Sequence, residues 1–383
     1  MFDTAAPDAR VLSNARIVTP DGIVEAGLAI AQGRIDGLTR AGGGHDLGGC
    51  FLIPGIVDLH TDHVERHTHP RVGVLWPALP ALLAYDAVVI SGGTTTVFDS
   101  LSVGAAMQKQ ERRDLFEPLV ATLCEAVAQD LFRAQHVLHL RCEVSDPATP
   151  GLMDAALGAP ETRLVSVMDH TPGDRQSPDI ERWFWHMIRD MEVHEEEGRR
   201  MMEELFDRSR THGAAVRRHV TQAAAQAGLP LMSHDDRTED HVEQAIAEGC
   251  TISEFPTTLT AARRARAEGM AIVAGAPNYL RGGSQSGNVA VAELLSEGLV
   301  DVLASDYIPR APLDAAFAIA SDHAMPHDLP QAIRMVTEAP ARMTGLTDRG
   351  TIAEGCRADL VAVDLVGAQP VVKAVWREGQ QVF

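Results

Sequence analysis

Hydrophobic residues in the middle of the chain occur in short runs separated by longer amphipathic stretches. Eight runs have the length of a β-strand and end at or near a polar residue: GIVDLH, TTTVFD, HVLHLRCE, RLVSVMDH, LPLMSH, CTISEF, AIVAGAP and VDVLASD. Nearly continuous apolar runs indicate strands that are buried on both faces, as in a parallel sheet whose crossovers are helices. Eight such units predict an α/β fold, a (β/α)8 TIM barrel, which we place at residues 54–346.

The two ends of the chain have a different pattern. Residues 1–53 alternate between apolar and polar positions and are interrupted by Gly and Asp, as in RVLSNARIVTPDGIVEAGLAIAQGRIDGL, and residues 347–383 have the same texture. Alternation without a helical period is typical of short strands joined by turns. We therefore expect the N- and C-terminal segments to form one small β-sandwich domain beside the barrel.

One segment inside the barrel region is too long for a single crossover. Residues 171–228 contain the charged stretch DIERWFWHMIRDMEVHEEEGRRMMEELFDRSR, whose pattern is helical. We expect a helical insertion here. It could serve as a lid or an oligomer surface, but a solvated pair of helices is the interpretation that we favour.

Composition narrows the range of partners. The formal net charge of −20 argues against nucleic-acid or anionic-membrane partners, which require a basic surface. No apolar run reaches the ~18 residues that span a bilayer, and the first residues, MFDTAAPDAR, carry an acid where a secretory signal carries basic residues. We expect a cytoplasmic protein whose partners are a small-molecule substrate and further copies of itself, as a homo-oligomer. The five scattered cysteines form no Cys-x-x-Cys pair and are expected to be reduced and buried.

Polar residues close nearly every predicted strand. The carboxyl ends of barrel strands meet at one mouth. In chain order, these ends carry His60 with Asp62, Asp99, Glu143, His170, His234 with Asp235, Glu254, Asn278 and Asp306. Any one of them has an ordinary explanation, such as a hydrogen-bonded core histidine or a salt-bridged acid. Taken together, they indicate a metal site.

The side-chain types suggest which ions would bind. Imidazole nitrogens and carboxylate oxygens suit Zn²⁺, Mn²⁺ or Fe²⁺, and the oxygen of Asp62 moves the preference toward Mn²⁺, Fe²⁺ or Mg²⁺. The candidate ligands exceed what one ion needs, so we expect one or two divalent ions, a pair lying ~3.5–4 Å apart. Such a centre activates water for hydrolysis, and Asp306 is expected to accept the proton. The candidate ligands are His60, Asp62, Glu143, His170, His234 and Asp306.

Longer stretches resemble a known family. PGIVDLHTDH, the acid in ASDY and the flanking β pattern resemble the amidohydrolase superfamily. HTDHVERHTHPRVGVLWP, HLRCE, SVMDHTPGDRQ, SHDD, EFPTT, GAPNYLRGGSQSGN and ASDYIPRAPLDAAF are similar to its phosphonate-metabolism branch, the diphosphatases of the carbon–phosphorus lyase pathway. The likeness runs from about residue 10 to the C-terminus. It implies hydrolysis of α-D-ribose 1-methylphosphonate 5-triphosphate at the α-phosphorus, giving the 5-phosphate and pyrophosphate.

The ligand pattern differs from that of much of the superfamily. The first strand there gives His-x-His, and later histidines come from strands five and six, whereas this chain has His60-x-Asp62 and ends its sixth strand in Glu254. The ligand set has therefore moved, and Glu143 on the third strand is expected to bridge the ions. The neighbouring histidines are expected on the first loop: His63, His67 and His69.

A triphosphate approaching an acidic protein requires local positive charge. The planar guanidinium of arginine matches phosphate oxygens, and barrels often build phosphate sites from backbone after the seventh strand. The expected substrate contacts are Arg71, Arg175, Arg281, Gly282, Gly283 and Ser284. Pairing with the abundant surface acids is the alternative for every arginine, and it is the one that we favour for Arg66 and Arg141.

Two other functions fit parts of the pattern. An amidohydrolase acting on a cyclic amide, or a deaminase, would use the same activated water in a site poor in arginine. The segment RGGSQSGN together with Arg175 favours an anionic substrate instead. A non-catalytic scaffold on a degenerate barrel would have lost the ligands that this chain keeps.

Overall fold

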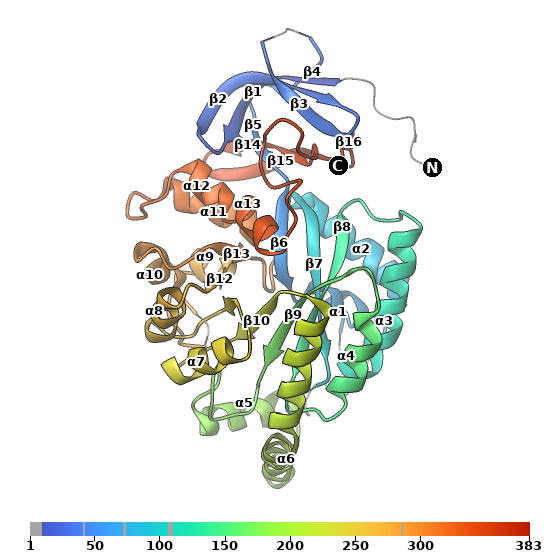
Figure 1. The fold of residues 1–383 in the computed structure, drawn as a ribbon, viewed down its shortest axis with the longest axis vertical. Helices are drawn as coiled ribbons and strands as arrows, with labels where there is room; N and C mark the ends of the chain where they lie inside the picture. The colour runs from blue at the N-terminus through green and yellow to red at the C-terminus, as the bar shows by residue number, and fades with distance from the viewer. Residues whose placement is uncertain (1–9, 41–42, 72–73, 106–109, 285) are drawn as a thin grey trace.

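The computed structural model describes residues 10–40, 43–71, 74–105, 110–284 and 286–383. These residues form an eight-stranded parallel barrel and a second, mixed sheet at one end of it (Figure 1). Every apolar run selected from the sequence forms one barrel strand, so the barrel prediction is confirmed. The strands are β6 (Ile56–Thr61), β7 (Thr94–Val103), β8 (Gln135–Glu143), β9 (Thr162–Met168), β10 (Leu231–His234), β11 (Ile252–Glu254), β12 (Ala271–Gly275) and β13 (Val302–Ala304).

The barrel strands lie side by side in chain order, from β6 to β13. A parallel bridge between Thr61 and Asp306 joins the first strand to the segment after the last. Parallel neighbours require long crossovers, and helices supply them. The helices are α1 (His63–Thr68), α2 (Ala78–Ser91), α3 (Gln110–Ala128), α4 (Thr149–Leu157), α5 (Ile180–Met191), α6 (Glu195–Ala227), α7 (Glu239–Ala247), α8 (Leu259–Ala267), α9 (Ala276–Leu280), α10 (Val291–Ser296), α11 (Ala311–Ser321), α12 (Leu329–Arg334) and α13 (Glu338–Met343).

The two ends of the chain join in one hydrogen-bonded sheet, here called the satellite sheet. Its strand order is β3-β2-β1-β5-β14-β15-β16, with β4 beside β1, and antiparallel pairing of β14 with β5 connects the C-terminal to the N-terminal segment. This confirms that both ends build one β unit. The exact division at residues 53/54 and 346/347 stays a prediction. The strands are β1 (Arg10–Thr19), β2 (Gly22–Ala31), β3 (Arg34–Thr39), β4 (His45–Asp46), β5 (Phe51–Pro54), β14 (Leu360–Val366), β15 (Gln369–Arg377) and β16 (Gln380–Gln381).

Hydrophobic side chains pack in layers around the barrel strands. One cluster inside the barrel contains Leu59, Phe98 and Met232, all fully buried. A larger cluster lies between the strands and the surrounding helices, and it also includes Phe51 and Ile53 of the satellite sheet. The apolar packing is therefore continuous from the barrel into the satellite sheet.

The predicted insertion consists of two helices, α5 and α6, between β9 and β10. Figure 1 shows them at the end of the molecule opposite the satellite sheet. Helix α6 is 33 residues long and mostly polar. None of the described helices is long and apolar enough to cross a membrane.

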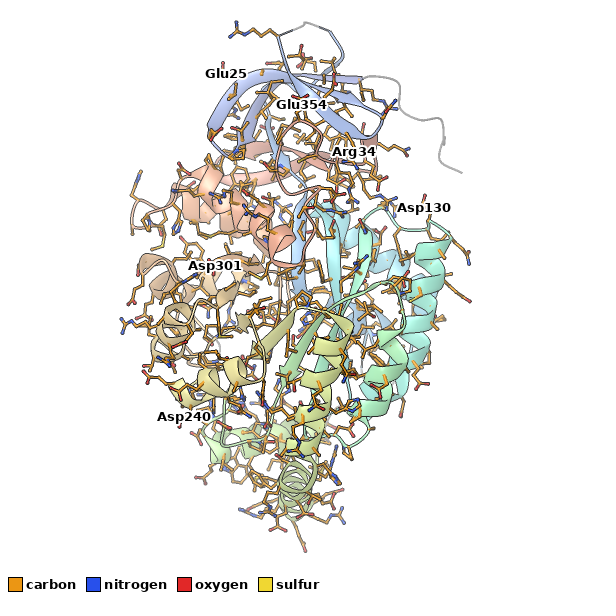
Figure 2. All side chains as sticks on the ribbon, in the orientation of Figure 1. Glu25, Arg34, Asp130, Asp240, Asp301 and Glu354 are labelled. Atoms are coloured by element: carbon orange, nitrogen blue, oxygen red, sulfur yellow. The ribbon has the colours of Figure 1, made fainter. Side chains whose placement is uncertain are left out.

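Acidic side chains occur on both parts of the molecule. Figure 2 shows Glu25 and Glu354 at the satellite sheet, and Asp130, Asp240 and Asp301 around the barrel. Because the chain has a formal net charge of −20, an anionic ligand needs cations at its binding site. All five cysteines are free; Cys50, Cys142 and Cys250 are buried as predicted, but Cys124 and Cys356 are partly exposed.

Candidate metal centre

Three barrel strands end in the same unusual backbone turn. A residue just beyond each strand has a positive φ: 57° at Asp235 and 55° at Phe255, directly after β10 and β11, and 53° at Asp306, two residues after β13. Each still donates its N–H to the neighbouring strand, as Asp306 does to the His60 carbonyl oxygen at 2.9 Å. A non-glycine residue in this conformation costs about 1–2 kcal/mol, which the surrounding barrel must offset. The turns fix the Asp235 and Asp306 side chains at the barrel mouth.

The first candidate ligands come from strand β6. Its register shifts between Asp58 and Thr61, and His60 within this irregular stretch is fully buried. The His60 Nε2 atom lies 3.6 Å from an oxygen of Asp62. One ligand atom each from His60, Asp62 and Asp306 lie within 4.8 Å of one another, so these residues can hold an ion together.

A second group lies beside the first. Ligand atoms of His170, His234 and Asp235 also lie within 4.8 Å of one another, and His234 Nε2 is 3.3 Å from Asp235 Oδ2. The His60 and His234 rings stack at 14° with centroids 5.8 Å apart, which makes the two groups neighbours. The structure thus brings together five of the six ligands predicted from the sequence, and it adds Asp235.

Two buried glutamates contact the histidines. Glu254 lies between His60 and His234, with one carboxylate oxygen 2.6 Å from each Nδ1 atom. Glu143 lies 2.7 Å from His170 Nδ1 and also accepts a hydrogen bond from Ser145. Burial by itself would raise the pKa of Glu254, but the two imidazoles lower it well below its usual value. Burial would also raise the pKa of Glu143, but the neighbouring His170 lowers it to about 2.

The geometry of these groups fits a divalent ion. Among the described residues, His60 Nε2 and Asp235 Oδ2 are buried atoms without a hydrogen-bond partner. Unpaired buried polar atoms are costly, and an ion bound to their lone pairs would compensate for this cost. Imidazole nitrogens with carboxylate oxygens are the donors that Zn²⁺, Mn²⁺ and Fe²⁺ accept.

Charged neighbours shape the mouth of the barrel. The buried Arg141 guanidinium on β8 forms an ion pair with Asp62. Burial raises the pKa of Asp306 to about 6, with His60 acting to lower it and Asp62 to raise it. An Asp306 carboxylate with this pKa can accept a proton near neutral pH.

A cleft opens beside the candidate ligands. Asp235 and Asp306 lie in it, and Arg281, Gly283 and Ser284 form part of its wall. The Arg281 guanidinium donates a hydrogen bond of 3.1 Å to the Tyr307 hydroxyl, which also lines the cleft. Three of the six predicted substrate contacts therefore lie together beside the candidate ligands: Arg281, Gly283 and Ser284.

The other predicted substrate contacts have different surroundings. Arg175 is buried, and it donates to an Asp236 oxygen at 2.6 Å and to the His234 carbonyl oxygen at 3.1 Å. Its neighbour Gln176 lines the cleft instead. Arg71 lies between α1 and α2 and is exposed.

The backbone after the seventh strand is less available than the sequence suggests. The N–H groups of Gly282 and Gly283 donate to the carbonyl oxygens of Tyr279 and Asn278. These bonds complete the C-terminal end of α9. These two N–H groups are therefore not free for a phosphate, which leaves Arg281 as the main candidate contact among these residues.

Two sequence predictions about strand ends are wrong. Asp99 does not reach the mouth: it lies on the outer side of β7, 2.8 Å from His136 Nδ1, whereas the adjacent Phe98 packs inside the barrel. Strand β7 continues to Val103, so Asp99 is in mid-strand and alternation turns it outward. The segment after β6 is also not a loop, because residues 63–68 form helix α1.

One buried polar residue of the site escaped the sequence prediction. His139 on β8 is fully buried and contacts the Ser166 hydroxyl, which in turn bonds to Glu254. A signal for it exists in HVLHLRCE, because His139, Arg141 and Glu143 alternate and so share one face of the strand.

Comparison with known proteins places the chain in a family. The model of the amidohydrolase family matches residues 121–383. The chain belongs to the amidohydrolase family. Among curated members, the chain is 36% identical over 377 residues to the α-D-ribose 1-methylphosphonate 5-triphosphate diphosphatase of Escherichia coli (strain K12), covering 97% of this chain and 100% of that protein. It is 25% identical over 366 residues to an imidazolonepropionase of Deinococcus deserti, covering 88% and 86%.

Solved amidohydrolase structures share the whole architecture. N-isopropylammelide isopropylaminohydrolase from Burkholderia multivorans superposes with a TM-score of 0.67 at 18% identity, covering 98% of each chain. 5-Methylcytosine deaminase from Klebsiella pneumoniae gives a TM-score of 0.62 at 18% identity, covering 97% of this chain and 98% of that one. Identities this low show a common fold of barrel and satellite sheet.

Proposed function

We propose that this amidohydrolase hydrolyses α-D-ribose 1-methylphosphonate 5-triphosphate to the 5-phosphate and pyrophosphate, as a step in phosphonate catabolism. The observation that carries the proposal is 36% identity along the full length of the Escherichia coli diphosphatase. The reaction is hydrolysis of a phosphoric anhydride. It requires an activated water, a proton acceptor and cations for the phosphates.

Fixed positive charge in and near the cleft supports a triphosphate substrate. Arg281 lies on the cleft wall, and the Arg141 guanidinium is buried at the barrel mouth beside Asp62. Arginine binds phosphate oxygens through two parallel N–H groups, which a neutral amide could not exploit. Arg281 thus supplies positive charge where the phosphates would bind, in a chain whose formal net charge is −20.

The candidate ligands divide into two ion sites. His60, Asp62 and Asp306 would hold one divalent ion, and the second group would hold another: His170, His234 and Asp235. Ions bound there lower the pKa of a water molecule and withdraw charge from the phosphoryl oxygens. Zn²⁺, Mn²⁺ and Fe²⁺ all suit this donor set.

The chain's own residues bind the substrate and handle the proton. Arg281, with Tyr307 and Ser284, would hold the terminal phosphates in the cleft and place the α-phosphorus toward the strand ends. The Asp306 carboxylate takes the proton of the attacking water. The bond from the α-phosphorus to the bridging oxygen then breaks, and Arg281 stabilises the departing pyrophosphate.

The proposal also includes the domain organisation, the location and the oligomeric state of the protein. Residues 1–53 and 347–383 form one β unit, and residues 54–346 form the catalytic barrel with its insertion around 171–228. We propose a cytoplasmic homo-oligomer. The exposed Trp185 and Ile180 on α5 support an intermolecular contact in the insertion.

The decisive assay compares two substrate classes. The metal-free protein, reloaded with Zn²⁺ or Mn²⁺, is expected to release pyrophosphate from the ribose 5-triphosphate, and chelator should abolish the release. A panel of cyclic amides and aminopyrimidines serves as the comparison, because the imidazolonepropionase and deaminase relatives favour that chemistry as a second candidate. Turnover of a cyclic compound without release of pyrophosphate would establish the second candidate.

A further inference from the structure

We propose that Glu254 and Glu143 are positioning residues rather than metal ligands. Each carboxylate accepts a hydrogen bond from the Nδ1–H group of one or two histidines. This contact fixes the ring so that its other nitrogen, Nε2, is directed at the ion. The proposal concerns how the chain orients His60, His170 and His234. It rests on the metal centre of the proposed function, but not on the identity of the substrate.

Glu254 uses both carboxylate oxygens on imidazoles. Its Oε1 atom is 2.6 Å from His60 Nδ1, and its Oε2 atom is 2.6 Å from His234 Nδ1. A carboxylate can only accept here, so each Nδ1 must carry the proton and each neutral ring has its lone pair on Nε2. These Nε2 atoms face the candidate oxygen ligands, Asp62 at 3.6 Å and Asp235 at 3.3 Å.

Glu143 repeats the arrangement on the third histidine. Its Oε2 atom is 2.7 Å from His170 Nδ1, and its Oε1 atom accepts the Ser145 hydroxyl at 2.8 Å. Both oxygens are therefore occupied by donors of the chain, which leaves Nε2 of His170 for the ion. A carboxylate on the far nitrogen of a ligating imidazole is a general feature of metal sites, where it fixes the ring and its tautomer.

Glu254 is itself held from inside the barrel. The Ser166 hydroxyl donates to Glu254 Oε2 at 3.0 Å. His139 lies on the other side of this hydroxyl, with Nε2 in contact with Ser166 Oγ and Nδ1 3.0 Å from the Leu59 carbonyl oxygen. Both ring nitrogens of His139 therefore have partners on the chain. In this proposal the buried group of His60, His139 and Glu254 is a hydrogen-bonded support for the two ion sites.

The proposal changes the ligand set expected from the sequence. Glu143 no longer bridges the ions, and the oxygen ligands become Asp62, Asp235 and Asp306. All three aspartates lie one or two residues beyond the end of a barrel strand, whereas both glutamates are the last residue of one. A single glutamate that orients one histidine from each group also couples the two ion sites.

Metal binding to two variants tests the two roles. Glu254→Gln is expected to weaken at least one ion by about 10–100-fold while two still bind at saturating Mn²⁺, because the single amide oxygen of glutamine can accept from only one of the two Nδ1–H groups. Glu143→Ala, which removes the acceptor of the His170 Nδ1–H, should weaken one ion by a similar factor and leave the other unchanged. Asp99→Asn is the matched control. The Asp99 carboxylate is also buried and contacts a histidine Nδ1 atom, that of His136 at 2.8 Å, but it lies outside the site. This variant should leave Mn²⁺ affinity unchanged.

The wild-type protein provides a direct readout that requires no variant. In ¹⁵N-histidine spectra of the Zn²⁺-loaded chain, three imidazoles should show a protonated Nδ1 and a zinc-bound Nε2. Glu254→Gln should change the Nδ1–H signals of His60 and His234, and Glu143→Ala that of His170.

Three results would overturn the proposal: zinc bound to Nδ1 in wild type, unaltered affinity in both variants, or the complete loss of one ion in Glu254→Gln. If a variant fails to fold, the wild-type spectrum still decides. These readouts do not involve the phosphate substrate. A failure to release pyrophosphate would therefore not contradict this proposal, and a failure of this proposal would not contradict the proposed reaction.

Discussion

At the scale of single residues, Asp306 combines several constraints. Its backbone is held at a φ of 53°, its N–H bonds to the His60 carbonyl oxygen, and its own carbonyl oxygen accepts from the Asp62 N–H at 2.7 Å. These bonds close the barrel at the point where the side chain meets the candidate ion site. The backbone therefore fixes the carboxylate where a proton acceptor is required.

Replacement of this carboxylate should separate catalysis from folding. Asp306→Asn is expected to keep the fold and part of the bound metal while kcat falls by about 10²–10⁴-fold, the usual contribution of a general base. Turnover and metal content are measured on the same preparation. Asp240→Asn, an exposed acid on α7, is the control and should change neither quantity. Unaltered turnover in Asp306→Asn would remove the base role.

Arg281 should govern substrate affinity. Its loss removes a charge-assisted hydrogen bond to phosphate, worth about 1.5–3 kcal/mol, so Arg281→Ala is expected to raise KM for the triphosphate by roughly 10–100-fold. Arg281→Lys should recover only part of this, because lysine lacks the planar fork. Arg263→Ala, which removes an exposed arginine paired with Glu297, is the control. Equal KM values for Arg281→Ala and wild type would show that the cleft wall does not bind the substrate.

At the scale of elements, a buried acid–imidazole–acid cluster joins α2 to the barrel. His136 on β8 contacts Asp99 of β7 at 2.8 Å and Asp86 of α2 at 3.3 Å. Arg133 pairs with Asp86 at the edge of the cluster, and the buried Tyr85 ring packs against the imidazole. Burial opposes a charged imidazole, but the carboxylates of Asp99 and Asp86 raise the pKa of His136 to about 9.

This cluster predicts a loss of stability in mild alkali. The pKa of His136 is higher in the folded chain than the value of about 6.5 expected when unfolded, so its stabilisation is complete below pH 6.5 and is lost as pH rises through about 9. The free energy of unfolding should fall over this range by on the order of 3 kcal/mol from this source. Urea denaturation at several pH values measures the fall, and Asp99→Asn should make it shallower. The same slope in both proteins would contradict the assignment.

The elements were predictable where a local pattern decides them. The length and hydrophobicity of the apolar runs identified all eight barrel strands, and charge with a helical period identified α5 and α6. Asp99 was misplaced because the sequence does not show that β7 extends four residues beyond it. The roles of Glu143 and Glu254 were equally hidden, since they depend on which imidazole nitrogen each carboxylate meets across strands.

At the scale of the whole molecule, the satellite sheet and the barrel share contacts that should make them unfold together. Phe51 and Ile53 of β5 belong to the same apolar cluster as the helices around the barrel. Gln135, the first residue of β8, accepts hydrogen bonds of 2.6 Å from both Arg349 and Arg357 of the C-terminal segment. This amide is one of several contacts that connect the C-terminal segment to the barrel.

Removal of the shared acceptor should lower overall stability. Gln135→Ala leaves two guanidiniums without this partner and is expected to reduce the free energy of unfolding by about 1–3 kcal/mol. In wild type, tryptophan fluorescence, to which the buried Trp376 contributes, and far-UV circular dichroism should follow one urea transition. Gln129→Ala, at an exposed site, is the control. Separate transitions in wild type would show that sheet and barrel unfold independently.

The central claim is that the barrel mouth activates water for attack at the α-phosphorus, and isotope tracing tests it most directly. The metal-loaded protein is given the ribose 5-triphosphate in H₂¹⁸O, and the products are read by ³¹P NMR. We predict ¹⁸O in the 5-phosphate of the ribose product, unlabelled pyrophosphate, and no turnover once chelator has removed the metal. Label in the pyrophosphate, or turnover that persists without metal, would contradict the account.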